Sequence, residues 1–119
     1  MGKIDEDLQD HAFLMSFRNV QERVHQTAIE KGWWDELREP GTILALIHCE
    51  VSECMEAIRE GNPPSKKVPE FSQAEEELAD VIIRIMDYAA YNQWDVAGAL
   101  VAKAAYNKGR AYRHGGKAF

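Results

Sequence analysis

Four carboxylates stand in two pairs that share a spacing of three residues: Glu50, Glu53, Glu77 and Asp80. Residues three apart lie on one face of an α-helix, so each pair would project together from its own helix. Each pair also falls within an apolar helical pattern, where acidic side chains have no packing function. Like charges in a partly buried site are costly unless a cation or a proton compensates them. We therefore predict a metal site formed by all four carboxylates.

All-oxygen ligation of this kind favours a hard cation, so Mg²⁺ is the expected ion, with Mn²⁺ as a substitute. Neither carboxylate segment carries the Glu-x-x-His pair of ferritin-like di-iron sites or a Cys-x-x-Cys pair for zinc. The neighbouring acids Glu56, Glu75 and Glu76 are predicted to be solvated helix positions. Asp87 is predicted to form a salt bridge with Arg84, which precedes it by three residues.

The chain from residue 103 onward carries five cations and no acid: Lys103, Lys108, Arg110, Arg113 and Lys117. This segment has a charge of +5, which leaves −11 on the remainder of a chain whose net charge is −6. A phosphorylated ligand that bridges the metal and the basic segment is the simplest interpretation. A solvated or nucleic-acid-binding segment is the alternative, but the overall acidity argues against a nucleic-acid partner.

The elements that must position these residues are helices. Apolar residues recur at helical spacing over about residues 5–31, 42–60, 71–93 and 96–112. Gly32 and the run Gly61-Asn62-Pro63-Pro64 end the first two helices, while Ser72 with Glu75 forms a capping box and Asp95 caps the last helix. With no alternating strand pattern, the expected fold is an all-α four-helix bundle forming a single domain over residues 1–119.

The second helix carries two stripes. One has the spacing of a packing seam with carboxylates at its middle: Ile43, Leu46, Glu50, Glu53 and Ala57. Five apolar residues are predicted to pack inward: Leu44, Ile47, Val51, Met55 and Ile58. Cys49 and Cys54 lie five apart on this helix, on different faces, so no disulfide between them is expected and a reducing cytoplasm is the expected location. No apolar run approaches the about 18 residues of a membrane span, so no membrane association is expected.

The ordered set of Glu50-x-x-Glu53 and Glu77-x-x-Asp80, on consecutive helices across a proline-containing loop, resembles the metal motif of a known superfamily. This superfamily is that of the all-α NTP pyrophosphatases, which includes the MazG-like proteins and the dimeric dUTPases. The resemblance extends over about residues 20–115. It implies a MazG-like bundle in which the second and third helices carry the metal site.

Downstream, Lys103-x-x-x-Asn107-x-x-Arg110 resembles the phosphate-contacting face of the family's last helix, with all three residues on one side. The branch most similar to this chain is that of the dCTP pyrophosphatases. There a histidine near the end of the first helix and a tryptophan before the metal helix line the base pocket, and His25 and Trp34 stand at matching places.

The base pocket has alternatives and departures from the family pattern. Trp33 is a substitute for Trp34, and a packing role is open for His25 and for both tryptophans. Glu60 and Arg84 stand where that branch tends to have aromatic residues.

The resemblance implies hydrolysis of a canonical or modified (deoxy)nucleoside triphosphate, dCTP among the candidates, to a monophosphate and pyrophosphate. Glu50 or Glu53 would orient and deprotonate the attacking water. Such an activity often removes surplus or non-standard nucleotides. We also expect an oligomer, because four helices with so much apolar surface leave a site open on one side, and the resemblance implies a homodimer or a dimer of dimers. The alternative is a non-enzymatic module for oligomerisation or partner binding.

Overall fold

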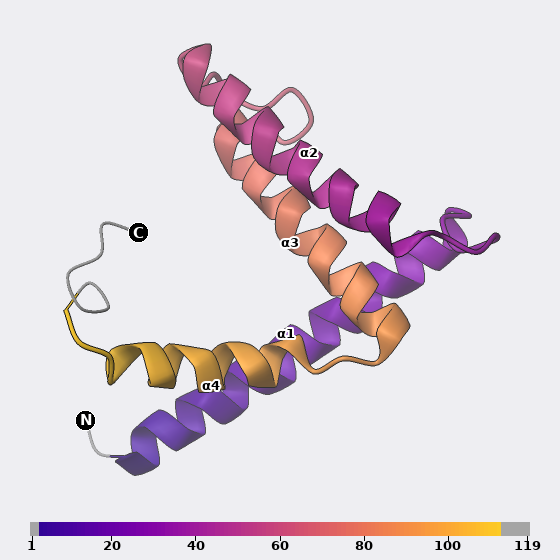
Figure 1. Ribbon diagram of the computed structural model, residues 1–119. Coiled ribbons are helices and arrows are strands. Elements are labelled where there is room, and N and C mark those ends of the chain that lie inside the picture. Colours follow the sequence, from indigo (N-terminus) through magenta and orange to yellow (C-terminus); the bar gives the residue numbers. More distant parts are fainter. Residues whose placement is uncertain (1–2, 113–119) are drawn as a thin grey trace. The chain divides into compact units, whose positions relative to one another are not determined.

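The computed structural model describes residues 3–112 of the chain. Four helices account for most of these residues: α1 (Lys3–Glu30), α2 (Pro40–Arg59), α3 (Gln73–Asn92) and α4 (Val96–Lys108) (Figure 1). No strand occurs between residues 3 and 112. The predicted all-α class and the four helices are therefore confirmed, although α4 ends four residues earlier than expected.

The helix boundaries have local causes that the sequence indicates correctly. Ser72 Oγ accepts a hydrogen bond from the Glu75 amide, and the Glu75 carboxylate accepts one from the Ser72 amide, so the predicted capping box is present. Asp95 caps α4 by accepting from the Gly98 amide at 3.0 Å. After α2, Gly61 has φ of 86°, in the left-handed region that a residue without Cβ adopts most easily, and the chain turns there.

The chain forms two compact units, and α1 contributes to both. The first unit comprises Met1–Val20 and Trp94–Phe119, and within it two hydrogen bonds join the guanidinium of Arg18 to the carboxylate of Asp95. The second unit comprises Gln21–Gln93 and contains α2, α3 and the end of α1. The single domain over residues 1–119 stays a prediction.

In the second unit, α2 and α3 run antiparallel and pack along their length (Figure 1). Their buried residues mix small or apolar side chains with two glutamates: Ile43, Glu50, Cys54 and Ala57 on α2, and Ala74, Glu77, Met86 and Ala89 on α3. Cys54 is buried and Cys49 exposed, and both are free thiols, so the expectation of no disulfide between them is confirmed.

The predicted inward stripe of α2 is wrong. Four of its five residues, Leu44, Val51, Met55 and Ile58, are 47%, 47%, 57% and 62% exposed, and Ile47 is half-buried. This stripe lies about 100° around the helix from the stripe of Ile43, Glu50 and Ala57, and one partner helix covers only one of the two. Helix α3 packs against the stripe that contains Glu50.

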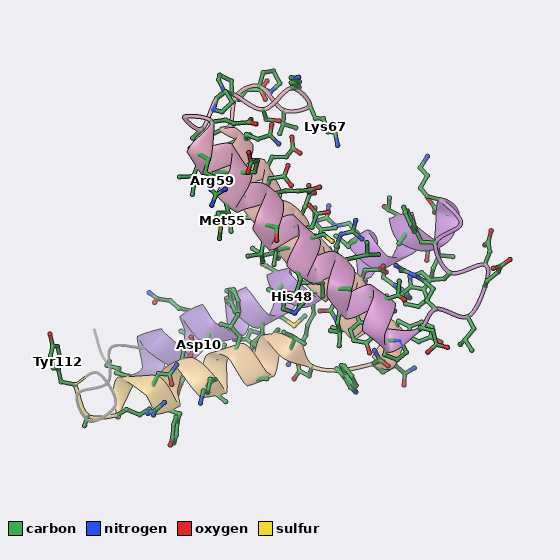
Figure 2. The ribbon with its side chains drawn as sticks, turned by 45° about the horizontal axis from the view of Figure 1, so that its top comes forward. Asp10, His48, Met55, Arg59, Lys67 and Tyr112 are labelled. Atoms are coloured by element: carbon green, nitrogen blue, oxygen red, sulfur yellow. The ribbon has the colours of Figure 1, made fainter. Side chains whose placement is uncertain are left out.

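The exposed apolar residues form one face of the hairpin. Val51 follows Glu50, and Leu78 follows Glu77, by one residue, so each lies about 100° further around its helix. In an antiparallel pair these two rotations lead to the same side, which is opposite to the side reached by Glu53. Figure 2 shows Met55 projecting from this face of α2. None of the helices described here is both long and apolar enough to cross a membrane.

Candidate metal centre

Helices α2 and α3 bring the four predicted ligands together, with a fifth acid beside them. Ligand oxygens of Glu50, Glu53 and Glu77 lie within 4.8 Å of one another, and so do those of Glu76, Glu77 and Asp80. The site is thus two groups of three carboxylates that share Glu77, whereas the sequence predicts one group of four. The spacing of three places both residues of each predicted pair on the helical face that meets the opposite helix, as expected.

Two carboxylate oxygens at this site are buried without a hydrogen-bond partner. Glu50 and Glu77 are 8% and 7% exposed. In each, Oε1 is satisfied, since Arg84 Nε donates to Glu50 at 3.0 Å and Gln73 Nε2 donates to Glu77 at 2.6 Å. The Oε2 atom of each is buried and has no partner among the described residues. Buried oxygens of this kind need a cation or a shared proton, so the residues present fit a metal ion.

The pKa shifts of the carboxylates also indicate that the site needs a cation or a shared proton. Burial, and then contact with Glu50 and Glu53, raises the pKa of Glu77 from 4.5 to about 7. Contact with Glu50 raises the pKa of Glu53, and burial followed by the charge of Glu50 raises that of Asp80. Burial alone raises the pKa of Glu50, but its contacts with Glu53, Arg84 and Glu77 outweigh this and hold the pKa below its ordinary value. Without a cation, the cluster therefore retains a proton near neutral pH.

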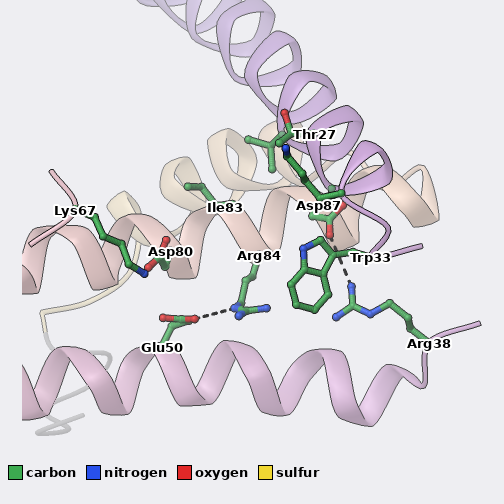
Figure 3. A pocket seen from close by; sticks show the side chains of 12 residues that line it. Thr27, Trp33, Arg38, Glu50, Lys67, Asp80, Ile83, Arg84 and Asp87 are labelled. Atoms are coloured by element: carbon green, nitrogen blue, oxygen red, sulfur yellow. Dashed lines mark hydrogen bonds and ion pairs between the residues drawn. The ribbon is translucent and has the colours of Figure 1, made fainter. Parts of the chain in front are cut away.

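Glu76 has a role that the sequence analysis missed. Its carboxylate accepts a short hydrogen bond from the hydroxyl of Ser65, which is 2% exposed. The same hydroxyl accepts from the amides of Lys67 and Val68 at 3.1 and 3.0 Å. These bonds fix the loop between α2 and α3 and hold Lys67 beside Asp80 (Figure 3). The prediction that Glu76 is a solvated position is wrong, and its spacing of four from Asp80 is the signal that could have placed it at the site.

A cavity of about 340 Å³ opens beside the carboxylates, within the unit formed by Gln21–Gln93 (Figure 3). Its walls carry three acids (Glu50, Asp80 and Asp87), four cations (Lys31, Arg38, Lys67 and Arg84) and five uncharged residues (Val24, Thr27, Ala28, Trp33 and Ile83). A hollow of about 320 Å³ around the carboxylates shares Glu50, Lys67 and Asp80 with it. Both volumes are typical of small-molecule sites.

The two predicted base-binding residues are engaged in a network around Asp87. His25 Nδ1 and Trp34 Nε1 contact the same oxygen of Asp87 at 2.7 and 2.9 Å. One face of Trp34 stacks on Tyr91, with ring centroids 4.0 Å apart, and the guanidinium of Arg38 lies 4.9 Å from the Trp34 centroid. Trp34 is therefore half-buried, with side chains of its own chain against its ring.

Trp33, the substitute considered in the sequence analysis, lines the cavity, whereas His25 and Trp34 do not. Trp33 is also 55% exposed, so its ring is accessible to a ligand. The predicted salt bridge between Asp87 and Arg84 is wrong, because Arg84 pairs with Glu50 and Asp87 pairs with His25.

The predicted phosphate-binding residues Lys103, Asn107 and Arg110 belong to the other unit, and all three are exposed. Lys103 Nζ and the Arg110 guanidinium lie 4.6 and 5.7 Å from the centroid of the Tyr106 ring. Because α4 ends at Lys108, Arg110 is not on the helix, and the expected common helical face of the three residues is wrong for Arg110. Their role toward phosphate stays a prediction. Arg113 and Lys117 lie outside the described residues.

Comparison with known proteins identifies no relative. No protein-family model, no curated protein and no solved structure matches the chain. The functional argument therefore depends on the residues, their contacts and their charges.

Proposed function

We propose that this protein is a Mg²⁺-dependent nucleoside triphosphate pyrophosphohydrolase of the MazG-like kind. The observation that carries the proposal is the pair of buried, unpartnered oxygens, Oε2 of Glu50 and Oε2 of Glu77, in overlapping carboxylate groups. A cavity with four cations adjoins these groups. A divalent cation next to a cationic cavity of this size is an arrangement suited to a nucleotide polyphosphate.

The ligand set favours Mg²⁺ over Zn²⁺, because every candidate ligand is a carboxylate oxygen. Bound here, Mg²⁺ would neutralise phosphate oxygens and lower the pKa of a coordinated water. Glu50 and Glu77 are the residues that would hold it in the first carboxylate group, and Glu77 with Glu76 and Asp80 would hold a cation in the second. Glu50 and Glu77 are buried between two packed helices, so their positions are fixed before a ligand arrives.

Glu53 is the residue best suited to take the proton of the attacking water. It belongs to the first carboxylate group but is exposed, unlike Glu50 and Glu77. Contact with Glu50 raises its pKa, which makes its carboxylate a better proton acceptor. In the reaction, the water oxygen bonds to phosphorus, its proton passes to Glu53, and the bond linking the α- and β-phosphates breaks to release the monophosphate and pyrophosphate.

The nucleotide base is proposed to lie against Trp33 in the cavity. The Trp33 ring is exposed there, whereas Trp34 is covered by Tyr91 and Arg38. Asp87 accepts from both His25 and Trp34, which reduces its capacity to bind a base amino group. The proposed pocket therefore selects for an aromatic base through stacking more than through hydrogen bonds to Asp87.

Pyrophosphate release from a panel of canonical and modified nucleoside triphosphates tests the proposal. With Mg²⁺, the wild type should turn over at least one member, while Glu53→Gln and Asp80→Asn should each lose about a hundredfold or more in kcat. Glu56→Gln is the matched control, since Glu56 is exposed on α2 and belongs to neither carboxylate group. Absence of turnover on the whole panel, together with an unchanged melting temperature on adding Mg²⁺, would refute the proposal.

The exposed apolar face of the hairpin favours a second candidate function, which is self-association or the binding of a helical partner without catalysis. Leu44, Val51 and Met55 on α2 and Leu78 on α3 contribute to this face, and each is about half exposed. Light scattering at micromolar concentration tests whether this face mediates self-association, and the turnover panel tests whether the protein is also a catalyst. An oligomer that Val51→Glu dissociates supports self-association, whereas a stable wild-type monomer contradicts it.

A further inference from the structure

The two adjoining hollows at the metal centre differ in charge. Five acids and two lysines line the hollow around the carboxylates, whereas four cations and three acids line the cavity beside it. Of those three acids, Glu50 and Asp80 also belong to the carboxylate groups, and Asp87 accepts from His25 and Trp34. The four cations and three acids give the cavity a net charge of +1, which a divalent cation at the adjoining carboxylates would make more positive, and phosphate oxygens bind well in such an environment.

Arg84 lines the cavity and is bonded to Glu50, which lines both hollows. Its Nε donates to Oε1 of Glu50 at 3.0 Å, and its side chain lines the cavity together with Lys67 (Figure 3). A guanidinium has five N–H donors, so this one bond leaves further donors for oxygens in the cavity. Oε2 of Glu50 is buried and has no hydrogen-bond partner in the described part of the chain. Glu50 therefore has one oxygen for Arg84 and one for a cation.

We infer that Arg84 binds the phosphate chain of the substrate while it remains bonded to Glu50, and so connects the metal site to the polyphosphate. The inference rests on the proposed function and adds Arg84 to the predicted phosphate-binding residues Lys103, Asn107 and Arg110. Its ligand class is a Mg²⁺-bound di- or triphosphate. The planar guanidinium suits this task, because two parallel N–H groups can donate to two phosphate oxygens.

The other arginine of the cavity has a different role. The guanidinium of Arg38 lies 5.5 and 4.9 Å from the ring centroids of Trp33 and Trp34, and its Nη1 is 3.9 Å from Asp87. These contacts hold the tryptophan loop against α3. Arg38 therefore fixes the wall of the cavity, and Arg84 is the guanidinium placed next to a metal ligand.

Calorimetry with two probes tests the inference: Mg²⁺ alone, and then inorganic pyrophosphate in the presence of saturating Mg²⁺. For Arg84→Gln we expect Mg²⁺ to bind about threefold more tightly, because a positive charge beside Glu50 is lost. We expect pyrophosphate to bind about tenfold or more weakly, because its charge-assisted hydrogen bonds are lost. Arg59→Gln is the matched control, since Arg59 is exposed on α2 and lines neither hollow, and it should change neither affinity.

The opposite signs of the two changes separate this role from a purely structural one. If Arg84 merely holds Glu50 in position, Arg84→Gln weakens Mg²⁺ binding as well, and that result overturns the inference, as does unchanged pyrophosphate binding. A wild type that binds neither probe refutes the proposed function instead. If Arg84→Gln does not fold, Arg84→Lys provides the test. Its affinity for Mg²⁺ should equal that of the wild type, and its affinity for pyrophosphate should be about threefold lower. A pyrophosphate affinity equal to that of the wild type overturns the inference.

Discussion

Replacing Glu77 with glutamine should stabilise the protein in the absence of divalent cations while it removes the metal site. Glu77 is 7% exposed, and burial is the main cause that raises its pKa to about 7. Glutamine has nearly the same shape and keeps an oxygen that can accept from Gln73 Nε2. It carries no charge, so the cost of burying a carboxylate disappears.

The size of the effect follows from proton linkage. Between its ordinary pKa of 4.5 and a pKa of about 7, Glu77 holds a proton in the folded state but not in the unfolded state. The wild type therefore loses stability as the pH rises through this interval, by about 3 kcal/mol in total. From about pH 5.5 to about pH 8, the wild type should lose about 2 kcal/mol relative to Glu77→Gln.

Urea unfolding at these two pH values, with EDTA present, measures the difference directly. Glu56→Gln is the control, because Glu56 is exposed and its substitution should give the same free energy of unfolding as the wild type at both pH values. Adding Mg²⁺ at the higher pH should stabilise the wild type but not Glu77→Gln. If the free-energy difference between Glu77→Gln and the wild type is the same at both pH values, the reasoning about the buried carboxylate is refuted.

Three further predictions concern the site and its supports. A proton on Glu77 competes with Mg²⁺, so calorimetry should show the apparent Kd for Mg²⁺ rising about tenfold between about pH 8 and pH 6; a constant Kd would argue against Glu77 as a ligand. Ser65→Ala removes the bonds from the α2–α3 loop to Glu76 and should cost about 1 to 3 kcal/mol in urea unfolding, whereas no loss would show that the loop is held otherwise. Ser72→Ala removes half of the capping box and should cost about 1 kcal/mol, and equal midpoints for variant and wild type would contradict this.

Much of the fold and part of the site follow from local sequence pattern. The helices, their caps at Ser72 and Asp95, and the turn at Gly61 are set by residues within a few positions of one another. The approach of Glu50 and Glu77 follows as well, because each lies in a helical stripe and helices consecutive in sequence are usually neighbours in space. Periodicity is sufficient for these features because it reports which residues share a face.

Only the tertiary structure decided which face of α2 packs against α3. Both stripes of α2 read as packing surfaces, and only the position of α3 shows that Glu50 is buried and Val51 is exposed. The partner of Arg84 is Glu50, 34 residues away, rather than the neighbouring Asp87. Asp87 instead contacts His25, 62 residues away.

Contacts between residues distant in sequence also decide which tryptophan lines the cavity and how Glu76 is held. Adjacent residues Trp33 and Trp34 have nearly the same local sequence context, but Trp34 is held by Asp87, 53 residues away, and Trp33 is left in the cavity. Glu76 is fixed by Ser65 across the loop between α2 and α3. The sequence by itself thus determined the helices and the meeting of the carboxylates, whereas the cationic cavity, its tryptophan and the role of Arg84 depend on contacts between distant residues, which no helical period encodes.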